Sequence, residues 1–198
     1  MKKQKLSILI GALACATFQP STQAGEFHFS AGLTYVQGVN KVYDALEDLY
    51  VADGYTVGDS LVIPVGISLN PYYEFDSGLA VGLDIGPASM VGIDYGSSVD
   101  ISYIVPVGAD VRYTFLRDKN FSPYIRAGIK YPIVGGPNVT SSELGGFGAV
   151  GVDLWRKNRV GMAIEVGYDT SKITVKGPGS DTKSVEYPGL TASLCVRF

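Results

Sequence analysis

The last twelve residues of the chain, 187–198, read YPGLTASLCVRF and alternate without interruption from Leu190 onward. One side carries apolar residues through to the final position, namely Leu190, Ala192, Leu194, Val196 and Phe198; the other side carries Thr191, Ser193, Cys195 and Arg197. A period of two indicates a β-strand with one apolar face. The last residues of a soluble domain are ordinarily polar and frayed, whereas this chain stops on an aromatic residue that continues the apolar face. The C-terminus is therefore predicted to be part of a sheet.

The composition favours a single β-rich domain preceded by an export signal. The 198 residues include 25 glycines and 13 tyrosines, which suits strands joined by tight turns. Residues 1–24 carry three lysines, an apolar run and a small-residue site ending at Ala24, the pattern of a secretory signal peptide. The predicted mature domain, residues 25–198, has 13 basic and 19 acidic residues, a net charge of −6 that disfavours nucleic-acid binding. It retains Cys195 alone, so no internal disulfide can form.

Seven further segments alternate in the same way, and the connections between the strands are long and short in turn. The eight predicted strands are 27–35, 61–75, 79–86, 101–116, 121–133, 144–154, 159–169 and 190–198. The first long connection contains NKVYDALEDLY, whose apolar spacing predicts a short acidic helix with Asn40 as its N-cap. The connections around 87–99 and 134–143 are predicted to be loops, and so is the polar stretch KGPGSDTKS, residues 176–184. Short turns at one end and long connections at the other are typical of a meander that crosses a membrane as a closed barrel.

Two features favour a membrane barrel over a soluble one. The polar face of the strands is mostly Gly, Ala, Ser and Thr, which suits the narrow interior of an eight-stranded barrel. Aromatic residues on the apolar face collect at the strand ends, as in interfacial girdles: Phe27, Phe29, Tyr73, Phe75, Tyr113, Phe115, Phe121 and Phe198 at the short-turn end, and Tyr35, Tyr103, Tyr131 and Tyr168 at the other. Pro71 is the exception, because a closed barrel offers it no free edge.

On these residues the chain resembles the superfamily of eight-stranded bacterial outer-membrane β-barrels, which includes OmpA-like transmembrane domains and opacity-type surface proteins. The resemblance covers about residues 25–198 and implies an all-β, antiparallel up-and-down barrel in the outer membrane of a Gram-negative bacterium. It implies a monomer in contact with outer-membrane lipid and lipopolysaccharide, with no cofactor. It also implies that the barrel assembly machinery reads the C-terminal strand through Leu194, Val196 and Phe198. A shared fold is a weak warrant for function.

The inward positions carry a set of charges that nearly balance: Glu74, Asp84, Asp110, Asp153 and Glu165 against Arg112, Arg126, Lys130 and Arg197. Asp110 and Arg126 lie on adjacent predicted strands at similar height and are expected to pair. The charges could line a polar pore or form a salt-bridge plug, and the plug is favoured because eight strands leave little more than side-chain room.

His28 and Ser30 share one face of the first strand, with Glu26 nearby, so an esterase triad of the kind used by an outer-membrane lipid A deacylase is one hypothesis. Their place, inward and near the short-turn end, is wrong for a lipid substrate. Cys195 is expected to be a small buried residue. No nucleotide loop and no metal-ligand spacing is present in the sequence.

The sequence thus favours a non-enzymatic barrel whose role is structural or lies in surface interaction, through extracellular loops that contact an external ligand or host surface. A narrow channel for small solutes is the first alternative, and a lipid A-modifying enzyme is the second.

Overall fold

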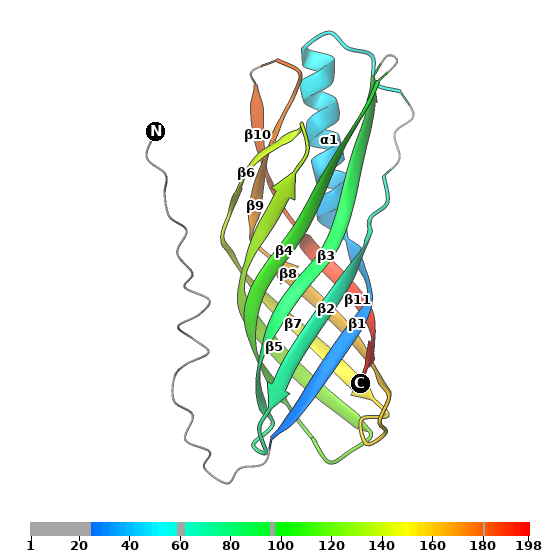
Figure 1. Cartoon of the computed structure of the whole chain (residues 1–198), viewed down its shortest axis with the longest axis vertical. Coiled ribbons are helices and arrows are strands. Elements are labelled where there is room, and N and C mark those ends of the chain that lie inside the picture. The colour runs from blue at the N-terminus through cyan, green and yellow to red at the C-terminus, as the bar shows by residue number, and fades with distance from the viewer. Residues whose placement is uncertain (1–24, 59–61, 96–97, 180) are drawn as a thin grey trace.

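The computed structural model describes residues 25–58, 62–95, 98–179 and 181–198, so the predicted signal peptide lies outside the described residues. Eight strands close into one antiparallel barrel in the order β1-β11-β8-β7-β5-β4-β3-β2 (Figure 1). Their bounds are β1 Glu26–Val36, β2 Val65–Glu74, β3 Leu79–Tyr95, β4 Ser98–Thr114, β5 Phe121–Gly135, β7 Gly145–Leu154, β8 Gly161–Asp169 and β11 Gly189–Arg197. The predicted all-β, eight-stranded meander is confirmed.

The C-terminal strand closes the barrel. β11 pairs with β8 on one side and with β1 on the other, where Ser30 lies opposite Arg197. The last residue continues this ladder, because the Phe198 amide donates to the Phe29 carbonyl oxygen at 2.8 Å. Apolar side chains on the outward face of the strands stay exposed, as a lipid-facing surface requires.

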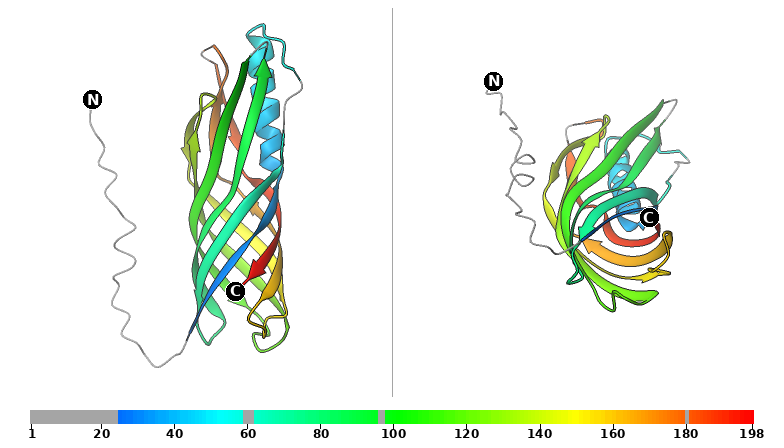
Figure 2. Two further views of the ribbon diagram at one scale, coloured as in Figure 1. Left: turned by 45° about the vertical axis from the view of Figure 1, so that its right-hand side comes forward. Right: turned by 60° about the horizontal axis from the view of Figure 1, so that its bottom comes forward.

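The barrel has two different ends. The floor end carries the short turns around 75–78, 115–120 and 155–160 and the two ends of the described chain (Figures 1 and 2). The other end carries residues 36–64, 87–104, 134–143 and 170–188, which we call the head; its described residues, which leave out 59–61, 96–97 and 180, form one folded assembly. No helix of the described residues is long and apolar enough to cross a membrane.

The head contains a 16-residue helix, whereas the sequence predicted a short helix within a loop. α1, Gln37–Ala52, follows β1 directly, and its N-cap is Val36 without a side-chain hydrogen bond. The prediction of Asn40 as N-cap is wrong, because the helix continues straight from the strand and Asn40 lies in its first turn. Gly38 allows this start, since its amide donates to the Pro188 carbonyl at 2.8 Å and a Cβ there would meet that oxygen at 2.6 Å.

The predictions of three loops at this end are also wrong, because each of them contains strand residues. Residues 87–95 and 98–100 are strand, so β3 and β4 extend beyond the barrel as a long hairpin beside α1. The Gly86-Pro87 dipeptide produces only a register shift in the ladders, after which the pairing resumes. The other long connections contain β6 Val139–Glu143, β9 Lys172–Lys176 and β10 Thr182–Glu186, which form a second sheet in the order β10-β9-β6.

The hydrophobic core of the described residues lies in the head. α1 contributes Val39, Val42, Ala45, Leu46 and Tyr50; the hairpin contributes Val91, Ile93 and Ile104; the second sheet and its flanks contribute Val139, Ile173, Val175, Val185 and Tyr187. α1 thus packs its apolar face between the hairpin and the second sheet (Figure 1). Figure 2 shows the helix continuing the barrel wall upward, within the outline of the strands.

Candidate functional site

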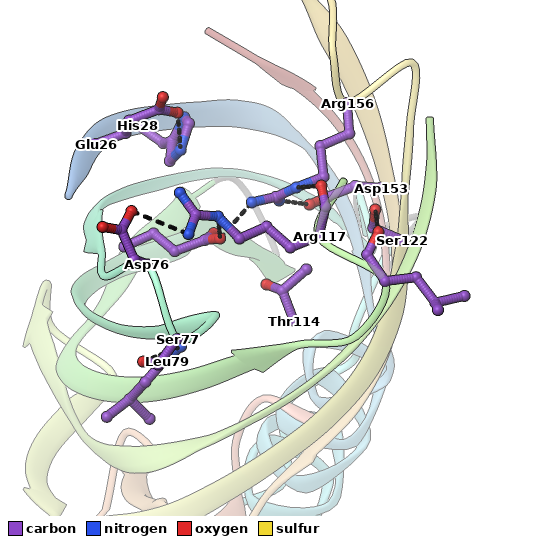
Figure 3. Close-up of polar contacts among 12 residues, drawn as sticks. Glu26, His28, Asp76, Ser77, Leu79, Thr114, Arg117, Ser122, Asp153 and Arg156 are labelled. Carbon is purple, nitrogen blue, oxygen red and sulfur yellow. Dashed lines mark hydrogen bonds and ion pairs between the residues drawn. The ribbon is translucent and has the colours of Figure 1, made fainter. Parts of the chain in front are cut away.

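The barrel interior contains a network of ion pairs in two layers. In the layer near the floor, Asp153 pairs with Arg112 and, at 2.7 Å, with Arg156. Arg156 also pairs with Glu74, which lies 3.4 Å from Arg117. Figure 3 shows Arg117, Asp153 and Arg156 of this layer. Asp153 and Glu74 are almost fully buried. Each of these carboxylates faces two guanidinium groups, which balance its charge where water cannot.

The second layer lies nearer the head and centres on Arg126. Its guanidinium is 2.9 Å from Asp84, 2.9 Å from Asp110 and 2.6 Å from Glu165. Lys130 adds a second cation, 3.0 Å from Asp84. The Arg126–Asp110 contact is the pair expected from adjacent strands, while the contact with Glu165 crosses from β5 to β8, which are not neighbours in the barrel.

Aromatic rings separate and support these layers. The Arg112 guanidinium lies 3.5 Å from the ring centroid of Tyr124 and 4.9 Å from that of Tyr72. The Lys130 ammonium lies 4.3 Å from the ring centroid of Phe147. Such cation–π contacts compensate part of the cost of holding these cations away from water. Sequence reasoning missed these rings, although they occupy inward positions of strands that it placed correctly.

The structure places all nine predicted lumen residues on the inward face. It adds Arg156 and Arg117, which the sequence assigns to short turns. Trp155 has a φ of 54°, in the left-handed region, and the chain beyond it turns back so that Arg156 enters the lumen. The sequence of the turn does not indicate that the chain bends back toward the lumen. No sequence signal therefore identifies Arg156 as a lumen residue.

The space that remains at the middle of the barrel, around the Arg126 layer, is small. A cavity of about 40 Å³ lies there, lined by small residues such as Ser30, Thr34 and Ser193 and by charged residues such as Arg126 and Glu165. One water needs ~10–15 Å³ of such volume, so the cavity has room for about three. Above it, Tyr187 is fully buried and hydrogen-bonds to Ser89, and the core of α1 begins.

The residues of the hypothetical esterase triad are not assembled. Ser30 Oγ donates to the Asn70 carbonyl oxygen at 3.5 Å, and the described hydrogen bonds include none between Ser30 and His28. His28 Nδ1 instead lies 3.2 Å from Arg197, while His28 Nε2 is 3.6 Å from Glu26. Among the described residues, no group of His, Cys, Asp or Glu is arranged to hold a metal ion.

The predicted girdle residues lie on the outward face at the strand ends. Most are exposed, and Phe29 and Phe75 are half-buried. The side chains of Leu194, Val196 and Phe198 are also exposed, on the outward face of the barrel wall. Exposed aromatic residues at both ends of an apolar wall are typical of the two interfaces of a bilayer.

The head combines buried polar contacts with an excess of acids. Tyr50 Oη lies 3.0 Å from Asp100 Oδ2 and 3.0 Å from Asn138 Oδ1, and Tyr95 Oη lies 3.1 Å from the same Asp100 oxygen. Burial, followed by the hydrogen bond with Asp100, raises the pKa of Tyr50. The head sequence carries ten acidic and four basic residues, a net charge of −6 that equals the net charge of the whole mature chain.

No protein-family model matches the sequence, and no curated protein matches it. Among solved structures, the chain is similar to the outer membrane protein OprG from Pseudomonas aeruginosa, with 14% identity, a TM-score of 0.58, and coverage of 88% of this chain and 95% of that one. It is also similar to E. coli Outer Membrane Protein W, with 21% identity, a TM-score of 0.49, and coverage of 89% and 98%. At such identities the likeness concerns the fold. Together with the closed barrel described above, the likeness to OprG shows that the chain has the fold of an eight-stranded bacterial outer-membrane β-barrel.

Proposed function

We propose that this protein is a non-conducting outer-membrane barrel that carries a folded, acidic head outside the cell, and that the head is a binding module. The observation that carries the proposal is the location of the hydrophobic core. Eight-stranded barrels can be closed by simple loops, but here fourteen buried apolar residues build a separate packed unit beyond the barrel. Ordering the long connections costs conformational entropy, which the packed core offsets. The result is a rigid surface, and such surfaces suit recognition of a partner.

Charge supports the same proposal and indicates the chemistry of the partner. The head has a net charge of −6, while the barrel strands and floor turns together are neutral. Acids such as Asp44 and Asp48 lie on the exposed face of α1, opposite its buried face. A surface of one sign attracts partners of the opposite sign and speeds their encounter, so a basic protein surface fits this head.

The proposed location in the outer membrane is supported by the apolar exterior and by the likeness to OprG, which is an outer membrane protein. In this orientation the floor faces the periplasm and the head faces outward, with lipopolysaccharide around the upper girdle. The barrel assembly machinery would read the exposed side chains of Leu194, Val196 and Phe198. Deletion of Phe198 is then expected to lower the amount of assembled barrel in cells while the purified chain still refolds in detergent.

The first test is planar-bilayer conductance of the refolded mature chain, residues 25–198. Silence from a barrel whose folded form migrates differently from the boiled form supports a filled lumen. Discrete steps that change in Asp110→Ala or Arg126→Ala would favour the alternative, a narrow channel, for which the small cavity of about 40 Å³ is the specific observation. Binding is tested separately, by titrating a lysine-rich peptide against the wild type and against Asp44→Asn/Asp48→Asn. Weaker, salt-dependent binding by the variant is expected, and equal binding would refute the role of the acidic surface.

A further inference from the structure

The floor of the barrel contains a hollow that the proposed function does not use. Its volume is about 410 Å³, and it opens at the end that bears the short turns. Five basic side chains line it: Arg117, Arg156, Lys157, Arg159 and Arg197. The acids among its lining residues are Glu26 and Asp118, and the C-terminal residue Phe198 also borders it. Figure 3 shows Glu26 and His28 on one wall, facing Arg117 and Arg156 across the lumen.

Arg197 distinguishes this hollow from an ordinary basic rim. It is 3% exposed, yet none of the ion pairs among the described residues includes it. Its Nη1 lies 3.2 Å from His28 Nδ1, its Nη2 donates to the Arg156 carbonyl oxygen at 2.6 Å, and its Nε has no partner within the described part of the chain. A guanidinium has five N–H donors, and a buried cation without a counter-ion is costly.

The neighbouring carboxylates are committed elsewhere. Glu74 pairs with Arg156 and Arg117, and Asp153 pairs with Arg112 and Arg156. Glu26 approaches His28 Nε2 at 3.6 Å, but 70% of its side chain is exposed, so solvent weakens its pull. Asp118 also lines the hollow but is exposed, so the buried guanidinium of Arg197 has no counter-ion among the described residues.

We propose that this hollow binds a single oxyanion group, a carboxylate or a phosphate, with Arg197 as its principal donor. Guanidinium forms its strongest hydrogen bonds with these two groups because its planar fork matches their oxygen pairs. The exposed Lys157 and Arg159 attract the anion to the opening, and the acids Glu26 and Asp118 limit the site to one small group rather than a polyanion. In the proposed orientation the ligand arrives from the periplasm.

The test uses the refolded mature chain, residues 25–198, in uncharged detergent micelles at constant ionic strength. Sodium acetate and sodium phosphate are titrated separately while nitrogen NMR follows the arginine Nε–H and histidine ring resonances. A saturable shift of the Arg197 Nε–H signal at millimolar anion is expected, and the better of the two salts identifies the class of oxyanion. The absence of a saturable shift with either salt would overturn the proposal.

Two variants separate a built site from diffuse attraction. Arg197→Gln should weaken binding by about tenfold or more, because a hydrogen bond to a charged group contributes ~1.5–3 kcal/mol. Arg159→Gln, on the exposed rim, should weaken binding less than about twofold, the effect of a solvent-screened charge. Equal losses in both variants would mean that only rim charge attracts the anion, which overturns the proposal. Should Arg197→Gln fail to fold, Arg197→Lys decides instead: it keeps the positive charge but removes the planar fork, so binding must weaken by more than in Arg159→Gln, and binding as tight as in the wild type overturns the proposal.

Discussion

Replacement of Leu46 by alanine should release α1 from the head while the barrel stays closed. Leu46 is 0% exposed and packs in the core that joins α1 to the β3–β4 hairpin and the second sheet. Truncation of a buried leucine to alanine costs ~2–5 kcal/mol, depending on how far the cavity collapses. Since ~1.4 kcal/mol changes an equilibrium tenfold, the opening of α1 should become at least about 30-fold more frequent.

Hydrogen exchange detected by mass spectrometry measures this opening directly, because amides of α1 exchange when the helix leaves its core. The matched control is Val51→Ala, on the same helix but 57% exposed, which should leave exchange almost unchanged. The gel shift between folded and boiled forms reports on the barrel. If Leu46→Ala left α1 as protected as in the wild type, the packing argument would be wrong. If it unfolded the barrel as well, the head and the barrel would be one cooperative unit.

Three further perturbations test the lumen, the membrane band and the head. Arg126→Ala leaves three carboxylates of the lumen without their common partner, so it should lower the free energy of unfolding, measured by urea titration, by ~3–5 kcal/mol. Arg117→Ala, at the partly exposed floor, should lower it by only ~0–1 kcal/mol. Similar values for the two variants would refute the salt-bridge plug. Val150→Arg lies on the outward face midway along β7 and should lower the free energy of unfolding in lipid vesicles by ~2–4 kcal/mol. Ile101→Arg, beyond the upper aromatic girdle, should lower it by ~0–1 kcal/mol. Equal losses would mean that the two aromatic girdles do not mark the membrane interfaces. Because the pKa of Tyr50 is raised, the unfolded chain loses that proton first, so the stability it gives the head is full below pH ~10 and falls as the pH rises further. Near-ultraviolet circular dichroism should show this alkaline loss, and Tyr50→Phe should reduce it.

The barrel could be predicted from the sequence because a strand with one face in lipid and one in the lumen alternates without exception. Residues such as Leu194 and Val196 carry this signal by themselves. The β3–β4 extension lacks it, because Val91 and Ile93 face α1 while Met90 lies on the outward face. Apolar residues therefore occur on both faces of this part of β3, and the alternating pattern is lost. The nearby Gly, Pro and Ser residues led to the prediction of a loop.

The charged lumen could be predicted in part, and the limit is geometric. Asp110 and Arg126 lie on neighbouring strands, so their register follows from the order of the strands. The contact between Arg126 and Glu165 depends on closure of the barrel, and that of Arg156 with Glu74 joins residues 82 positions apart through a turn of unknown direction. Neither follows from periodicity.

The division of charge between the parts of the molecule argues that folding and function are separable. In the lumen, acids and bases alternate at ion-pair distance, and every cation there except Arg197 has a carboxylate partner among the described residues. Such pairs satisfy groups that the barrel has buried and leave no surplus to recognise a ligand. Charge without an ion-pair partner remains in the acidic head and, among the described residues of the floor, on the buried guanidinium of Arg197. Variants of the Arg126 layer, which does not border the floor hollow, should therefore change stability without changing ligand binding, whereas surface variants of the head and Arg197 variants should change binding first.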